Sequence, residues 1–118
     1  MEMNNQEIIK SLKAIIEALE QEQGTTFDFG NGPVPAHRHK NPDGSIGGWV
    51  ADSAHVHTTA YIGEDAMVYE NAMVYGDAIV FGDAWVYGKA MVYGKARVYG
   101  KARVYGKAMV SGDARVSE

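Results

Sequence analysis

An aliphatic residue occupies every sixth position over more than half of this chain, and alanine stands two positions before nearly every one. The aliphatic series is Val50, Val56, Ile62, Val68, Val74, Val80, Val86, Val92, Val98, Val104, Val110 and Val116, and the alanine series runs from Ala54 to Ala114. A unit of six residues is too short to bury its own apolar side chains, so it must stack on copies of itself. The two series therefore predict a repeat structure over residues 47–118.

The typical unit reads Ala, a variable residue, Val, Tyr, Gly, and then Asp or Lys. Successive residues of an extended strand point to opposite faces, so Ala and Val are expected to point inward and the variable residue and Tyr outward. Glycine tolerates the positive φ of a sharp corner. Three strands and three corners would close a coil of about 18 residues, and the repeat region would form about four triangular coils.

The repeats, for example Gly-Lys-Ala-Arg-Val-Tyr at residues 94–99, closely resemble the hexapeptide-repeat family over residues 47–118. The lead-in at residues 44–50 is similar to repeat proteins of bacteria and their phages that are labelled putative transferases. The resemblance implies a left-handed parallel β-helix that is usually assembled as a trimer. We therefore expect an all-β fold, a left-handed parallel β-helix preceded by one N-terminal α-helix.

Residues 5–22 carry the pattern of an amphipathic helix. Ile8, Leu12, Ile15 and Leu19 have the spacing of a coiled-coil seam, and Asn4 or Asn5 can cap its start. Such a helix is marginally stable alone, so it should pack either on copies of itself or on the repeat body. The expected organisation is an oligomerising helix in residues 1–24, a linker or cap in 25–46 and the β-helix in 47–118.

Residues 25–46 break the periodicity and contain turn sequences such as Asn31-Gly32 and Asn41-Pro42-Asp43-Gly44. The first coil of a β-helix exposes strand edges and apolar core that something must cover. We expect this segment to fold over that coil. Phe27, Phe29 and Val34 are the candidate plugs.

Stacking residues that lie 18 apart places columns of Met, Trp and Tyr on the outside of the coils. A monomer that exposed so much contiguous apolar surface would aggregate, so these columns are expected to form subunit interfaces of a homotrimer. The expected interface residues are Met73, Met91, Met109 and Trp85 on the coils and Ile8, Leu12, Ile15 and Leu19 on the helix. Stacking of trimers into a larger assembly through the last coil stays open.

Charge is distributed unevenly along the repeats. Six acidic residues and no Lys or Arg lie between residues 49 and 84, whereas seven Lys or Arg and two acidic residues lie between 85 and 118. Either the corners merely need soluble residues, or the basic end attracts an anion or an acidic protein partner. The acidic half argues against extended nucleic acid as a ligand.

Other partners are restricted by composition. The chain has no cysteine, which excludes disulfides and thiolate metal sites, and no apolar run long enough to cross a bilayer. The N-terminus lacks the features of a secretion signal. We expect a cytoplasmic protein without a membrane partner.

One functional hypothesis is a non-catalytic binding or scaffolding module that sequesters a small anionic ligand, such as a nucleotide, at subunit interfaces. Aromatic stacking and positive charge would hold the ligand. The candidate ligand-binding residues are Tyr69, Tyr87, Tyr93, Tyr99, Arg97, Arg103, Lys89 and Lys95.

The alternative is an acyltransferase-like enzyme. Many hexapeptide-repeat proteins use an acyl-coenzyme A and a histidine base, for which His55 and His57 are the candidates. The uninterrupted repeats provide no extruded loop to form an acceptor pocket, so we expect no catalysis and no cofactor. His37, His39, His55 and His57 are weak candidates for metal ligands, and no metal site is predicted.

Overall fold

A computed structural model of the protein describes residues 4–12 and 25–118. Residues 5–12 are helical, and Asn4 caps this helix because its Oδ1 accepts a hydrogen bond from the Glu7 N–H at 2.8 Å. The second half of the predicted helix, with Ile15 and Leu19, lies outside the described residues. No helix within the described ranges is long and apolar enough to cross a bilayer.

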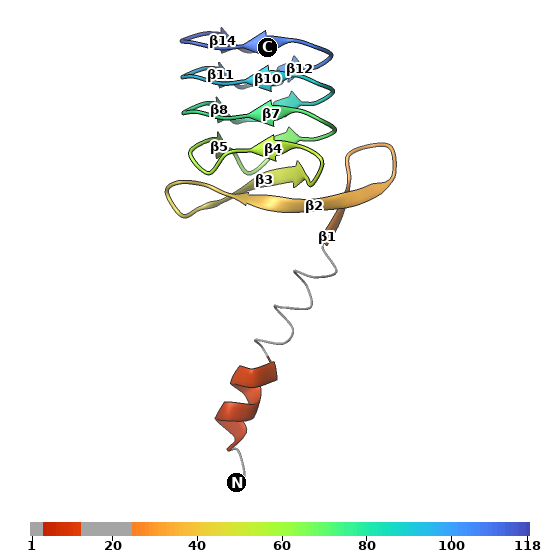
Figure 1. The fold of residues 1–118 in the computed structure, drawn as a ribbon, viewed down its shortest axis with the longest axis vertical. Helices are drawn as coiled ribbons and strands as arrows, with labels where there is room; N and C mark the ends of the chain where they lie inside the picture. The colour runs from red at the N-terminus through yellow and green to blue at the C-terminus, as the bar shows by residue number, and fades with distance from the viewer. Residues whose placement is uncertain (1–3, 13–24) are drawn as a thin grey trace.

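Twelve short strands, β3 to β14, form a parallel β-solenoid of about four coils (Figure 1). The strands are β3 (Ile46–Ala51), β4 (His55–Val56), β5 (Tyr61–Ile62), β6 (Met67–Val68), β7 (Met73–Val74), β8 (Ile79–Val80), β9 (Trp85–Val86), β10 (Met91–Val92), β11 (Arg97–Val98), β12 (Arg103–Val104), β13 (Met109–Val110) and β14 (Arg115–Val116). They make three faces. The first face contains β3, β6, β9 and β12, the second β4, β7, β10 and β13, and the third β5, β8, β11 and β14.

The register of the strands confirms the 18-residue coil. On the second face, Met73 pairs with Met91, and Met91 pairs with Met109. Backbone hydrogen bonds join successive coils, for example from the Tyr75 N–H to the Val92 carbonyl at 3.0 Å. Strand residues that are 18 positions apart in the sequence therefore lie directly beside each other in successive coils.

The interior consists of the aliphatic and alanine series, as predicted. The largest fully buried side chains are Ile62, Val50, Val68, Val74, Val80, Val86, Val92 and Val98. The alanines of the series from Ala54 to Ala102 are also buried, whereas Ala108 and Ala114 are exposed because no further coil covers the last one. The outward residues are then free to differ from coil to coil.

Glycine makes most corners because the backbone there adopts a positive φ. The seven repeat glycines from Gly76 to Gly112 have φ between 62° and 70°. At Gly94 a Cβ atom would lie 2.9 Å from the Gly112 nitrogen, so the corner also lacks room for a side chain. Glu70 occupies one such corner with φ 58°, a conformation that costs an L-residue energy.

Residues 25–40 form an antiparallel hairpin that extends the first face. Strand β1 (Thr25–Asp28) pairs with β2 (Pro33–Lys40), and β2 pairs antiparallel with β3. Strand β2 runs across the end of the stack next to β3 and β4 (Figure 1). The predicted linker is therefore a strand-forming cap, which its turn-rich sequence did not indicate.

The predicted plugs of this cap were wrong. The Phe27 ring stacks on the outward Trp49 at 4.8 Å, the Phe29 ring stacks on the outward Tyr69 at 4.8 Å, and Val34 is 39% exposed. The end of the coil is instead closed by His39 and Asn41, both buried. Unpaired backbone groups at a sheet edge need hydrogen bonds, which an apolar plug cannot supply.

His39 and Asn41 supply these hydrogen bonds directly. The His39 Nε2 lies 2.8 Å from the Ala60 carbonyl oxygen. The Asn41 Nδ2 donates to the Ile62 carbonyl at 3.0 Å, and the Asn41 Oδ1 accepts from the Ile62 N–H at 2.8 Å. The amide side chain thus pairs with both backbone groups of Ile62, as a neighbouring strand would.

Candidate functional site

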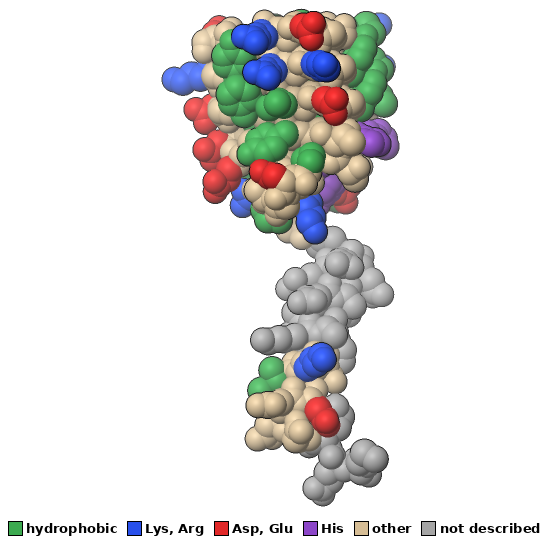
Figure 2. Space-filling model, turned by 90° about the vertical axis from the view of Figure 1, so that its left-hand side faces the viewer, with side chains coloured by type: hydrophobic (Ala, Val, Ile, Leu, Met, Phe, Trp, Pro, Cys, Tyr) green, Lys and Arg blue, Asp and Glu red, His purple; other side chains and the backbone are tan. Residues whose placement is uncertain are grey.

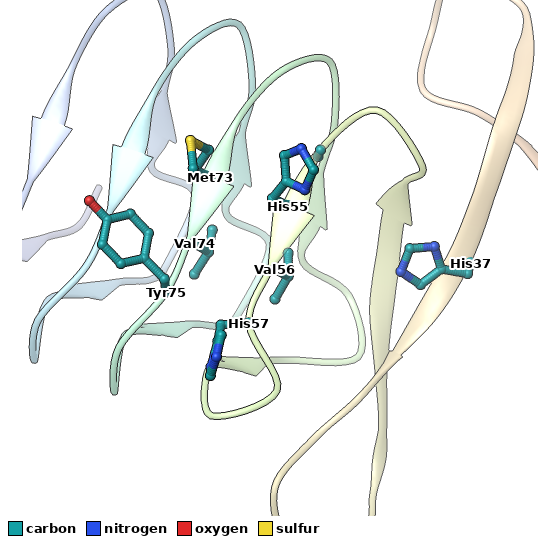
Figure 3. Close-up of a pocket in the computed structure, with 8 residues that line it drawn as sticks. His37, His55, Val56, His57, Met73, Val74 and Tyr75 are labelled. Carbon is teal, nitrogen blue, oxygen red and sulfur yellow. The ribbon is translucent and has the colours of Figure 1, made fainter.

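A concavity of about 520 Å³ lies on the second face, where the cap meets the first coils. His55 and Met73 form one side and His57 and Tyr75 the other, with Val56 and Val74 between the two rows (Figure 3). The rows arise because outward residues alternate with the inward valines on β4 and β7. His37 projects from β2 beyond the edge of β4 (Figure 3).

The histidines around this concavity differ in their partners. The His37 Nδ1 lies 2.8 Å from the Asp52 Oδ1, with both side chains about half exposed. The His57 Nδ1 lies 2.9 Å from the Thr59 Oγ1. Among the described residues, neither ring nitrogen of His55 has a hydrogen-bond partner. Among the described residues, His55 is therefore the histidine of the concavity with both ring nitrogens free, whereas His37 and His57 each have the Nδ1 engaged.

His39 does not belong to this group, although the sequence places it two residues after His37. Its side chain lies inside the cap, only 6% exposed, and its Nε2 is engaged by Ala60. Burial lowers the pKa of His39, outweighing the hydrogen bond to Ala60, which raises it. His37 and His39 do not share one outward face, because the His37 side chain is about half exposed and that of His39 lies inside the cap.

The four histidines considered as metal ligands are consequently not assembled into one site. Within the described residues, no group of three His, Asp or Glu side chains has the spacing to hold a metal ion. Only His37, His55 and His57 border the concavity.

Sequence reasoning missed the pair formed by His37 and Asp52. Fifteen positions separate the two residues, and they meet because β2 runs antiparallel to β3, with His37 opposite Val50. A carboxylate that holds a histidine ring is the usual way of orienting a general base. No signal in the sequence indicated the pair, since the hairpin itself was not predicted.

The outward aromatic residues stack on one another along each face. On the first face the order is Phe29, Tyr69, Tyr87 and Tyr105, with ring centroids 4.8 to 5.4 Å apart. Tyr75 stacks on Tyr93 at 4.9 Å, and Phe81 stacks on Tyr99 at 5.1 Å. The ring faces of Tyr69 and Tyr87 are therefore already occupied, and burial raises the pKa of the Tyr69 hydroxyl.

The candidate ligand-binding residues are distributed over all three faces. Tyr69, Tyr87 and Arg103 lie on the first face, where the Arg103 guanidinium stacks over the Trp85 ring at 4.1 Å. Tyr93, Lys95, Arg97 and Tyr99 follow one another around the corner between β10 and β11, and Lys89 lies at the corner between β9 and β10. Tyr69 and Tyr87 are in direct stacking contact on the first face, and no single face brings the whole group together.

Two arginines stand side by side next to this corner. Arg97 on β11 pairs in register with Arg115 on β14, and both side chains are exposed. In the described part of the chain, the sole side-chain ion pair joins His37 to Asp52, so neither guanidinium is neutralised by a carboxylate. Like charges directly opposite on neighbouring strands destabilise a sheet. An anion bound between these arginines would remove that repulsion.

The candidate interface residues are placed outward, as the repeat requires. Met73, Met91 and Trp85 are partly buried, whereas Met109 is 63% exposed. On the helix, Ile8 is 42% and Leu12 is 52% exposed, so this part of the helix does not bury its apolar side chains against the solenoid. Figure 2 shows bands of hydrophobic side chains on the solenoid, with Lys and Arg beside them on the coils distant from the helix.

Comparison with known families finds a repeat model that matches part of the solenoid. Residues 72–88, 96–112 and 102–118 match the family model described as the YdcK beta solenoid repeat. No curated protein and no solved structure matches the chain. The matched segments lie within strands β7 to β14 and leave the cap and the helix outside. The chain is a β-solenoid repeat protein whose C-terminal coils are similar to the YdcK beta solenoid repeat.

Proposed function

We propose that the protein is a self-assembling β-solenoid of the hexapeptide-repeat type, with left-handed coils, that acts as a non-catalytic binding or scaffolding module. A homotrimer in the cytoplasm is the assembly that we favour. The observation that carries this proposal is the outward column Met73, Met91 and Met109 on the second face, next to the stacked pair Tyr75 and Tyr93. Apolar surface of this extent calls for a partner.

A second copy of the chain is the partner that best fits these features. The apolar side chains of the helix, Ile8, Ile9 and Leu12, are 42% to 52% exposed, and an isolated short helix of this kind gains its stability by packing. The helix and the second face would then be covered by the same assembly. Methionine suits such a contact, because its flexible side chain adapts to the opposing surface.

Sedimentation of the Met91→Glu variant tests the proposed interface. A carboxylate in the centre of the methionine column would be buried without a partner, so we expect the oligomer to dissociate. Lys107→Glu is the matched control, because it introduces the same carboxylate at an exposed corner. An unchanged mass for Met91→Glu would refute the assignment of the second face.

The ligand that we favour for the module is a small anion, such as a nucleotide. Arg97 and Arg115 support this choice, because they are adjacent in register, exposed and without an acidic partner among the described residues. Lys95 at the neighbouring corner adds a further positive charge. Guanidinium groups bind phosphate through paired hydrogen bonds.

Thermal unfolding against a panel of nucleotides and acyl-coenzyme A tests the anion proposal. We expect at least one anion to raise the midpoint of thermal unfolding of the natural chain. The same anion should not raise the midpoint of the double variant Arg97→Gln/Arg115→Gln. Arg38→Gln is the control, because Arg38 lies in the cap. No shift for any anion, or an equal shift for the double variant, would exclude this site.

The acyltransferase-like alternative is favoured by one observation, the His37–Asp52 pair at the edge of the concavity. A histidine held by a carboxylate is equipped to accept a proton from an acceptor hydroxyl or amine. Incubation with acyl-coenzyme A and amine or hydroxyl acceptors tests this alternative, and release of free coenzyme A would favour it over a binding module.

A further inference from the structure

We propose that the second face holds a binding site for a soft monovalent metal ion, Cu(I), formed by His55, Met73, Met91 and Met109. These residues occupy the same outward position on four neighbouring strands, in the order β4, β7, β10 and β13. His55 pairs with Met73, Met73 with Met91, and Met91 with Met109. The fold thus converts residues 18 positions apart into one column of an imidazole and three thioethers.

The spacing of this column suits an ion that is bound by two side chains on neighbouring coils. Adjacent strands lie about 4.8 Å apart. The methionine side chain is flexible, so two neighbouring sulfur atoms can approach one ion from either side. In the single chain, His55 and Met73 project side by side into the concavity, which is open to solvent there (Figure 3).

His55 is the histidine best placed to act as a ligand. The Nδ1 of His37 is engaged by Asp52 and the Nδ1 of His57 by Thr59, and the buried His39 is engaged at its Nε2 by Ala60. Neither nitrogen of the His55 ring has a hydrogen-bond partner in the described ranges. The His55 ring can therefore turn toward Met73 without losing a hydrogen bond to the protein.

The donor set selects the metal. Thioethers favour Cu(I), whereas zinc in proteins is held by imidazole, thiolate and carboxylate groups. The chain has no cysteine, and the described residues contain no cluster of three His, Asp or Glu side chains suited to a metal. The column offers nitrogen and thioether sulfur alone, the combination that a soft ion accepts.

The corresponding columns of the other faces differ in composition. On the first face the column is Trp49, Met67, Trp85 and Arg103, and on the third it is Tyr61, Ile79, Arg97 and Arg115. These two columns combine aromatic, aliphatic and arginine side chains. Among the described residues, the second face is the one on which all four strands carry an imidazole or thioether donor at this position.

Titration of the full chain with Ag(I), a redox-inert substitute for Cu(I), tests the proposal by calorimetry. Met73→Leu/Met91→Leu removes two thioethers and retains apolar side chains of similar size. We expect affinity to fall at least about tenfold, since even outer-shell substitutions weaken metal binding by that factor. Met67→Leu is the control, because Met67 lies between Trp49 and Trp85 with no thioether neighbour.

NMR spectra of chains labelled at the methionine methyl groups locate the bound ion. Ag(I) should shift the signals of Met73 and Met91, and His55→Gln should weaken the shift at Met73. Equal affinity for the natural chain and Met73→Leu/Met91→Leu, or an equal loss with Met67→Leu, would overturn the site. The leucine variants should retain the mass of the natural chain, so failure of the metal site and failure of the proposed interface remain distinguishable.

Discussion

The His39 Nε2 lies 2.8 Å from the carbonyl oxygen of Ala60, inside the cap that closes the first coil. His39 reaches this carbonyl from β2, across 21 positions of sequence, and is only 6% exposed. A backbone acceptor at the end of a solenoid is thereby satisfied by an ionisable side chain. The stability of the cap is consequently tied to the protonation of one histidine.

We expect the protein to become less stable as the pH falls below the ordinary histidine range. Burial lowers the pKa of His39 in the folded chain, and the neighbouring His37 lowers it further, so the unfolded chain binds the proton more readily. The contribution of His39 is complete above the ordinary histidine pKa of 6.5 and is lost as the pH falls from there through the lower pKa of the folded chain.

Urea unfolding at a series of pH values measures this dependence. The His39→Gln variant should have a flatter profile below pH 6.5, the ordinary pKa of a histidine. His55→Gln serves as the control, because His55 is exposed and makes no hydrogen bond to the described residues. Profiles of equal slope for the natural chain and His39→Gln would contradict the assignment.

Replacing Asn41 should destabilise the cap strongly. Its side chain is 3% exposed and makes hydrogen bonds to both the N–H and the carbonyl of Ile62. Asn41→Ala leaves both groups without these partners, and each costs about 1–3 kcal/mol when buried and unpaired. The free energy of unfolding should fall by about 2 kcal/mol or more, and a loss below about 0.5 kcal/mol would show that water replaces the amide.

Substitution at a glycine corner and at the Glu70 corner should change the stability of the chain in opposite directions. Gly94→Ala places a Cβ atom 2.9 Å from the Gly112 nitrogen in a backbone with φ +68°, so we expect a loss of about 2 kcal/mol. Glu70→Gly relieves a residue with φ 58° and should stabilise the chain by about 1 kcal/mol. Thermal unfolding of both variants checks the pair, and a destabilised Glu70→Gly would show that the Glu70 side chain compensates for its backbone.

The candidate catalytic residues can be separated by turnover. Should acyl transfer be detected, His37→Ala and Asp52→Asn should each lower it about tenfold or more, because Asp52 holds the His37 ring. His57→Ala should have a smaller effect, since the partner of the His57 Nδ1 is the Thr59 hydroxyl and not a carboxylate. Turnover unaffected by His37→Ala would remove the pair from consideration, and loss with His55→Ala would restore the base expected from the sequence.

The solenoid could be predicted from the sequence because its structure repeats. A fixed period places Met73 beside Met91 and Arg97 beside Arg115 without any knowledge of distant contacts. The glycine corners and the Asn4 helix cap followed from local backbone chemistry in the same way. In these regions the position of a residue in its unit determines what surrounds it.

A cap over the first coil was expected, but its strands could not be predicted, because its contacts with that coil are neither local nor periodic. The β1–β2 hairpin, the buried His39 and Asn41, and the His37–Asp52 pair all depend on where β2 crosses the first coil. Composition suggested that Phe27 and Phe29 would plug the coil, but the exposed backbone groups required polar partners instead. The candidate site is built from both the repeat and the cap. The positions of its residues on β4 and β7 could be predicted from the repeat, whereas the position of His37 on β2 could not.

The solution mass of the natural chain, measured by sedimentation across a wide range of concentrations, tests the central claim most directly. The methionine column on the second face and the exposed helix side chains predict a stable species with three times the 12.8 kDa mass of one chain. That species should dissociate in Met91→Glu and persist in Lys107→Glu. A single 12.8 kDa chain at high concentration would contradict the account.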